Sequence, residues 1–255
     1  PCDGLSAPKQ PRNLPKAVSV DQMQAMLDAE PEDGLETRDR AMADNIAMDF
    51  VTHLTTRFGA RPAGSKSEQD AAAWAAFQGG NVPAWLRPNA GSKVAWVPVE
   101  YTRAGHRVRL RVAPDYFSVG VTAPVRVPLD PQTAQRIADA LGAMLPTPAM
   151  VDAIWEAAPA KLGVHSQSPG DGESRNGNRL VAAINAAVER DLAALGNPSG
   201  LRAGHMKDIV VPPNPGKVAI YGWHGNDPGV VQGYNPVSHN DNYMDYSHGT
   251  RLIDR

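Results

Sequence analysis

The chain has 255 residues, of which 42% are hydrophobic, 20% are charged and 6% are aromatic. This composition is typical of a globular protein and excludes a fibre or a disordered tail. Lysine and arginine number 25 against 27 aspartate and glutamate residues, so the formal net charge is -2. Because no basic run exceeds two residues, we expect no nucleic-acid partner.

The cysteine content and the length of the apolar runs exclude further classes of protein. The single cysteine, Cys2, excludes intramolecular disulfides and zinc sites built from several thiolates. The longest apolar runs, such as residues 94–97, are far shorter than the roughly 20 residues that cross a bilayer, so we expect no transmembrane segment. The sequence begins at Pro1 without a methionine, which suggests either a removed leader or a trimmed chain. With a removed leader we expect a secreted or periplasmic protein.

The first third of the chain predicts an extended arm followed by helices. Residues 1–18 contain four prolines and little periodicity. Apolar residues then recur at helical spacing, and Ser65 with Glu68 forms a capping box before the last of these helices. The predicted helices cover residues 18–30, 37–58 and 69–77.

Beyond residue 81 the pattern changes to strands that alternate with helices. The run 107–112 alternates arginine with apolar residues, which is typical of a sheet with one face in water. Asp130-Pro131 and Thr147-Pro148 predict helix starts, because the first residue caps free amides and proline suits the first helical position. The predicted strands are 93–100, 107–112, 121–127, 208–211 and 217–221, and the predicted helices are 131–144, 148–162 and 179–195.

These elements predict an α+β fold, in which the helical first third packs on a mainly antiparallel sheet. We expect an arm over residues 1–18 and a single compact domain over 19–255. Its loop-rich segment from about residue 204 to 255 is the predicted functional region.

Histidines and carboxylates are concentrated in that segment. Histidine transfers protons near neutral pH, and a carboxylate can orient it or raise its basicity. Asp245 and His248, three residues apart, suit such a pair on a helical turn. The predicted catalytic residues are His205, Asp208, His224, Asp245 and His248.

Aromatic and polar neighbours predict substrate contacts. Trp223 and His224 form a pair that is flanked by Gly222 and Gly225. The small glycines leave the pair sterically open, so we expect the aromatic face of Trp223 to be accessible to a substrate. Ser247 is expected to be a cap or a supporting donor, because it does not face its neighbour His248. The predicted substrate-binding residues are Lys207, Trp223, Tyr243, Tyr246, Ser247 and Arg251.

A metal site is an alternative for the same residues. His205, His224 and His248 could hold zinc, with Asp208 or Asp245 as an oxygen ligand, although their spacing matches no short zinc motif. A calcium site is a further alternative, although no EF-hand loop is present. Its ligands would be Asp227, Asp241 and Asp245. The sequence therefore does not identify a cofactor, and zinc is one candidate.

Six segments carry a resemblance to a known family. They are Gly79 to Arg87, Ala113 to Tyr116, Leu145 to Thr147 with Val151-Asp152, Gly204 to Asp208, Tyr221 to His224, and Asp245 to Gly249 with Arg251-Leu252. Through them, residues 75–253 resemble a family of exported bacterial hypothetical proteins that has no assigned activity. The resemblance implies export and a single domain, and it brings no mechanism.

Two shorter stretches are similar to peptidases. Residues 57–65 look like the opening helix and loop of zinc aminopeptidases, but the downstream ligand pattern of that family is missing. Residues 204–208, 218–221 and 245–249 are similar to a permuted papain-like cell-wall peptidase. Tyr246 stands at the cysteine position of that family, so its thiol mechanism does not carry over.

The sequence thus predicts an exported hydrolase acting on a polar polymer, such as a glycan or a cell-wall component. His248 would be the general acid or base, Asp245 its orienting partner, and His205 with Asp208 a second pair. The alternative is a non-catalytic carbohydrate or cell-wall binding protein, which would bind a polymer or a small polar ligand without turnover. In a third hypothesis the C-terminal polar network only fixes the chain's tail to the sheet.

Overall fold

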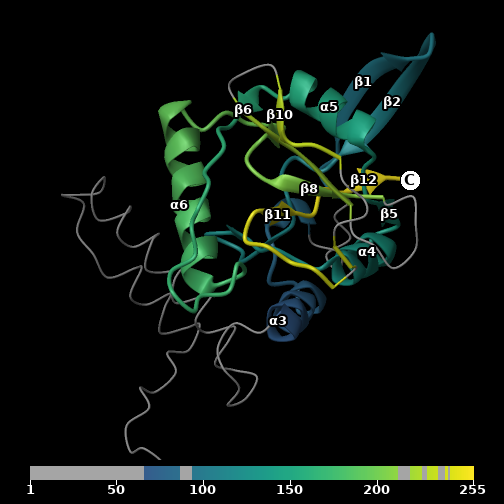
Figure 1. Cartoon of the computed structure of the whole chain (residues 1–255). Coiled ribbons are helices and arrows are strands. Elements are labelled where there is room, and N and C mark those ends of the chain that lie inside the picture. Colours follow the sequence, from purple (N-terminus) through teal and green to yellow (C-terminus); the bar gives the residue numbers. More distant parts are fainter. Residues whose placement is uncertain (1–65, 87–93, 212–218, 226–228, 235–238, 241) are drawn as a thin grey trace, which may run out of the picture. The chain divides into compact units, whose positions relative to one another are not determined.

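The computed structural model describes residues 66–86, 94–211, 219–225, 229–234, 239–240 and 242–255 (Figure 1). All of them belong to the second of the two units, 1–40 and 41–255, into which the chain divides. The predicted arm and the predicted helices over 18–30 and 37–58 lie outside the described residues. The described part combines helices with mostly antiparallel strands, which confirms the mixed α+β class. The single-domain organisation stays a prediction.

Two helices of the described part, α4 and α5, begin where their capping residues predict. Asp130 accepts a hydrogen bond from the backbone of Thr133 at the start of α4, and Thr147 accepts one from Met150 at the start of α5. The described helices are α3 (Lys66–Gln78), α4 (Pro131–Ala140), α5 (Pro148–Ala157) and α6 (Asn178–Ala194), with a 3-10 turn at Ala84–Leu86.

Two predicted helices extend too far along the chain. α4 ends at Ala140 rather than 144, because Gly142 takes a left-handed φ of 65° and the chain then enters strand β5 (Ala143–Met144). α5 ends at Ala157 rather than 162, because Pro159 favours an extended conformation of Ala158.

The first sheet has the strand order β1-β2-β12-β5. β1 (Val97–Arg103) and β2 (His106–Val112) form an antiparallel hairpin, and β12 (Ile253–Asp254) pairs with both β2 and β5. Ala104 and Gly105 both have positive φ, as a tight two-residue hairpin turn requires. The inner face of this sheet packs with α5 in one apolar cluster.

The second sheet has the order β10-β9-β8-β11 and positions most of the candidate residues. Its strands are β8 (Lys207–Val210), β9 (Ala219–His224), β10 (Val230–Gln232) and β11 (His248–Gly249). β11 runs parallel to β8, and the other pairs are antiparallel. Two short ladders complete the strands, β3 (Ser118–Val119) with β4 (Val125–Arg126) and β6 (Ala160–Lys161) with β7 (Arg202–Ala203).

The predicted strand over 121–127 is therefore mostly loop, since only Val125–Arg126 is extended and paired there. No helix among the described residues is long and apolar enough to cross a membrane.

Candidate functional site

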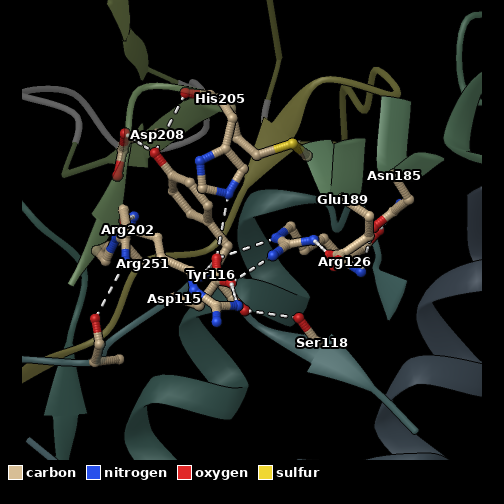
Figure 2. A network of polar contacts seen from close by, with 12 residues as sticks. Asp115, Tyr116, Ser118, Arg126, Asn185, Glu189, Arg202, His205, Asp208 and Arg251 are labelled. Carbon is tan, nitrogen blue, oxygen red and sulfur yellow. Dashed lines mark hydrogen bonds and ion pairs between the residues drawn. The ribbon is translucent and has the colours of Figure 1, made fainter. Parts of the chain in front are cut away.

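A buried ion network surrounds Asp115, in the loop after β2 (Figure 2). Arg126 of β4 contacts both carboxylate oxygens of Asp115, with Nε at 3.1 Å from Oδ1 and Nη2 at 2.6 Å from Oδ2. Arg126 also donates to Glu189 of α6 at 2.7 Å, and Arg202 of β7 approaches Asp115 at 3.4 Å. We call these four residues with His205 the Asp115 network; it joins segments that are far apart in the sequence.

His205 belongs to this network as a neutral donor. Its side chain is fully buried, and Nε2 lies 3.2 Å from Oδ1 of Asp115. Burial lowers the pKa of His205 to about 4, although Asp115 opposes this shift. Burial disfavours the charged carboxylate of Asp115, but Arg126 and His205 hold its pKa well below the usual range. At pH 7 we therefore assign the proton of His205 to Nε2, which leaves Nδ1 as the acceptor nitrogen.

Asp208 lies beside the network and is also buried (Figure 2). The Tyr116 hydroxyl donates to its Oδ2 at 2.8 Å, and the guanidinium of Arg251 lies 3.8 Å from the Tyr116 ring centre. Burial raises the pKa of Asp208 to about 7, although Arg251 and the Tyr116 hydrogen bond oppose the shift. Asp208 thus has a carboxyl group that exchanges a proton near neutral pH.

The backbone of β9 has an unusual conformation immediately before His224. Gly222 and Trp223 both take positive φ, 99° and 57°, and such a value costs a non-glycine residue about 1 to 3 kcal/mol. The Trp223 indole donates to the His205 carbonyl at 3.2 Å. A Cβ on Gly222 would lie 3.4 Å from Asp208 Oδ2 and 3.5 Å from His224 Cε1. The same Cβ would lie 3.1 Å from Cγ1 of Val151, so α5 packs closely against this glycine.

His224 forms a second polar cluster with α5, which we call the His224 site. Its Nε2 lies 3.3 Å from Oδ1 of Asp152, and the Tyr221 hydroxyl donates to the same oxygen at 2.9 Å. The imidazole stacks on Trp155 at a centre distance of 5.0 Å. Burial lowers the pKa of His224, although Asp152 opposes the shift, so the ring is neutral at pH 7.

Asp152 connects this site to the surface. Its side chain is 51% exposed, and it lines a groove of about 510 Å³ beside α5 and β1. The alanines of α5 in the groove leave space that larger side chains would fill. The lining residues are Glu100, Tyr101, Thr102, Arg103, Ala149, Asp152, Ala153, Glu156 and Ala157.

The predicted Asp245–His248 pair spans the turn that leads into β11, of which His248 is the first residue. Oδ1 of Asp245 accepts hydrogen bonds from the Ser247 backbone at 3.0 Å and the Ser247 hydroxyl at 2.6 Å. The backbone N–H of His248 donates to the Asp245 carbonyl at 3.0 Å. Burial favours the protonated form of Asp245, but the hydrogen bonds from Ser247 keep its pKa below the usual range. Ser247 is thus a supporting donor to Asp245, as its position predicts.

The remaining predicted binding residues lie in two surroundings. Lys207 and Tyr243 are half-buried, and the Lys207 amine lies 4.6 Å from the Trp223 ring centre. Tyr246 is buried and its hydroxyl bonds to the Gln167 backbone, while Arg251 is fully buried and donates to the carbonyls of Ala113 and Arg202. Their substrate-binding role stays a prediction.

Among the described residues, no three His, Cys, Asp or Glu side chains form a group that could hold a metal ion. The histidines predicted for zinc are distributed over the Asp115 network, the His224 site and the start of β11. Asp227 and Asp241, predicted for calcium, lie outside the described part of the chain.

Sequence reasoning missed residues on which these clusters depend. Asp152 is the partner that exposes the His224 site to the groove, and Asp115 with Arg126 forms the buried pair to which His205 donates. Asp115, Tyr116 and Asp152 all belong to the segments that carry the family resemblance, which was the available signal.

Comparison with known proteins adds a short local similarity. The chain is 52% identical over 44 residues to the tyrosine recombinase XerC of Escherichia coli strains K12 / DH10B and SMS-3-5 / SECEC, which is 17% of this chain. It spans 15% of the length of these relatives. No family profile matches the chain. No solved structure matches it.

Proposed function

We propose that this protein is a hydrolase acting on a polar polymer, a glycan or a cell-wall component, with the His224–Asp152 pair as its acid–base centre. The observation that carries the proposal is the 3.3 Å contact between Nε2 of the buried His224 and Oδ1 of Asp152, whose side chain lines a groove of about 510 Å³. Neutral histidines oriented by carboxylates serve as general bases, and ligand sites are commonly grooves of this size.

The surroundings of His224 suit proton transfer. With Nε2 directed at Asp152, Nδ1 of the neutral ring is the basic atom that takes a proton from water as the water oxygen attacks the substrate. Asp152 then stabilises the imidazolium, and the Tyr221 hydroxyl fixes the carboxylate in place. The imidazolium then returns this proton to the leaving group, so the proton is conserved over the reaction.

The groove suits a polar polymer segment. Tyr101 and the alanines offer apolar surface to the faces of sugar rings. The Thr102 hydroxyl donates or accepts hydrogen bonds with sugar hydroxyl groups, and the carboxylates accept hydrogen bonds from them. The local match to XerC covers too little of either chain to support a recombinase activity.

We expect His224→Gln and Asp152→Asn each to lower kcat about a hundredfold on the best substrate of a polymer panel, with binding retained, because each removes one member of the base. His165 and Asp191 supply the matched control, since they form a comparable pair at 2.7 Å away from the groove. His165→Gln and Asp191→Asn should leave kcat unchanged. Binding without turnover in the parent protein would favour the non-catalytic alternative, and equal losses in both pairs would refute the assignment.

The pH profile provides a second test of the same base. Because burial lowers the pKa of His224 below its ordinary value of 6.5, the basic form persists at lower pH than for a free imidazole. We therefore expect the acidic limb of the kcat profile to have its midpoint below pH 6.5. A midpoint above pH 6.5 would contradict a neutral buried histidine as the base.

We also propose that the protein is exported, as a secreted or periplasmic protein. The family resemblance supports this location, and a polymer of the cell wall would be encountered there. Fractionation of cells that express the full natural chain tests it, with recovery in the cytoplasm alone as the contrary result.

A further inference from the structure

The outer face of β2 carries a row of exposed arginines. Arg107, Arg109 and Arg111 alternate with Val108 and Leu110, and their side chains are 67%, 69% and 62% exposed. Alternate residues of a strand point to the same side and are about 7 Å apart. Figure 1 shows the β1–β2 hairpin with its turn directed away from the neighbouring elements. We call these three side chains the arginine face.

Positive charge exceeds negative charge on this hairpin. Residues 97–112 contain four arginines and one acidic residue, Glu100, a formal charge of +3 in a chain whose total is -2. Glu100 is shared, since its two oxygens contact Arg107 and Arg109 at 2.8 Å each. Arg111 contacts Asp254 of β12. Exposed ion pairs such as those of Glu100 are weak, so the anionic groups of a ligand can replace Glu100 at little cost.

The arginine face adjoins the groove of the His224 site. Glu100, Thr102 and Arg103 of β1 line that groove, and Glu100 is also the carboxylate that contacts the arginine face. Thr102 pairs with Arg107, and Glu100 pairs with Arg109, in the ladder between the two strands. An extended chain lying across the hairpin would therefore reach the groove over the edge of β1.

We propose that the arginine face binds an anionic polysaccharide and holds it beside the groove. Guanidinium groups bind carboxylate, sulfate and phosphate groups through two parallel hydrogen bonds. The residues paired with the arginine face are Pro98, Glu100 and Thr102, and none of these has an aromatic ring on which a nucleic-acid base would stack. The choice of a polysaccharide rests on the proposed function, and it narrows the polar polymer to an anionic one.

The test measures binding of dextran sulfate and of uncharged dextran of equal length by calorimetry, in 50 mM and 200 mM salt. We expect binding of dextran sulfate alone, and the Arg107→Gln/Arg109→Gln double variant should lose at least about tenfold in affinity and depend less on salt. The control is Arg179→Gln/Arg190→Gln, which removes the same charge from two exposed positions of α6 and should bind as the parent does. His224→Gln should also bind normally, so a failure of the hydrolase proposal leaves this result intact.

Three outcomes would overturn the proposal. One is equal loss of affinity in the two double variants, which would mean attraction to overall charge. Another is equal affinity for single-stranded DNA of the same charge, which would remove the preference for a polysaccharide. The third is no measurable binding by the parent protein in 50 mM salt. Circular dichroism of the variants verifies that each is folded.

Discussion

Arg126→Met is expected to destabilise the folded protein by about 3 to 5 kcal/mol, measured by urea unfolding at pH 7. Arg126 is buried and provides two of the contacts that compensate the charge of Asp115. Removing it leaves a buried carboxylate with Arg202, at 3.4 Å, as the remaining cation in contact. Such a charge is costly because the protein interior solvates it poorly.

A double-mutant cycle identifies the cause of that loss. Asp115→Asn removes the charge while keeping an acceptor for the backbone of Tyr116 and for His205, so Arg126→Met/Asp115→Asn should recover more than about 1 kcal/mol relative to Arg126→Met. Arg107→Met is the matched control, since its pair with Glu100 is exposed, and it should cost less than about 1 kcal/mol. Equal costs for Arg126→Met and Arg107→Met would show that burial of the pair is energetically unimportant.

Gly249→Ala is expected to destabilise the protein by about 3 kcal/mol, because a side chain at this position has no space. A Cβ on Gly249 would lie 2.6 Å from Cδ1 of Tyr116 and 2.7 Å from Cβ of Met206. β11 would have to move away from β8, and the Tyr116 ring, whose hydroxyl donates to Asp208, would be displaced. Thermal and urea unfolding measure the loss.

Gly233→Ala is the matched control for this substitution. A Cβ on Gly233 would meet no heavy atom within 4 Å, and this glycine has no left-handed φ, so alanine there should be neutral or slightly stabilising. If Gly249→Ala were tolerated equally well, the close contact between β11 and Tyr116 would not exist in solution.

Local features of the chain were predicted correctly from the sequence. Asp130 and Thr147 cap backbone amides only three residues away, so their roles depend on local sequence. The alternation of arginine and apolar residues over 107–112 likewise predicts a strand with one face in water. The ends of α4 and α5 were wrong, although Gly142 and Pro159 were visible in the sequence. What made β5 a strand was its pairing with β12, more than a hundred residues later.

The candidate site also combines contacts that are local in the sequence with contacts between distant segments. The turn that joins Asp245 to Ser247 and His248 is local, and the sequence predicted that these residues lie together. His224 was also nominated, but its partner Asp152 is 72 positions earlier, on α5. No spacing rule connects these two residues, because a contact between a helix and a strand depends on how the core packs.

The amino-acid sequence alone was enough to predict the starts of α4 and α5, the water-facing side of β2, the charge of the hairpin and the residue types available for proton transfer. The protonation states and the partners of these residues depend on the folded structure. Burial raises the pKa of Asp208 to about 7 and lowers that of His205 to about 4, so two residues nominated for similar chemistry have different environments. The reason is physical: the cost of a charge depends on the solvent and ions around it, and distant segments supply these only after folding.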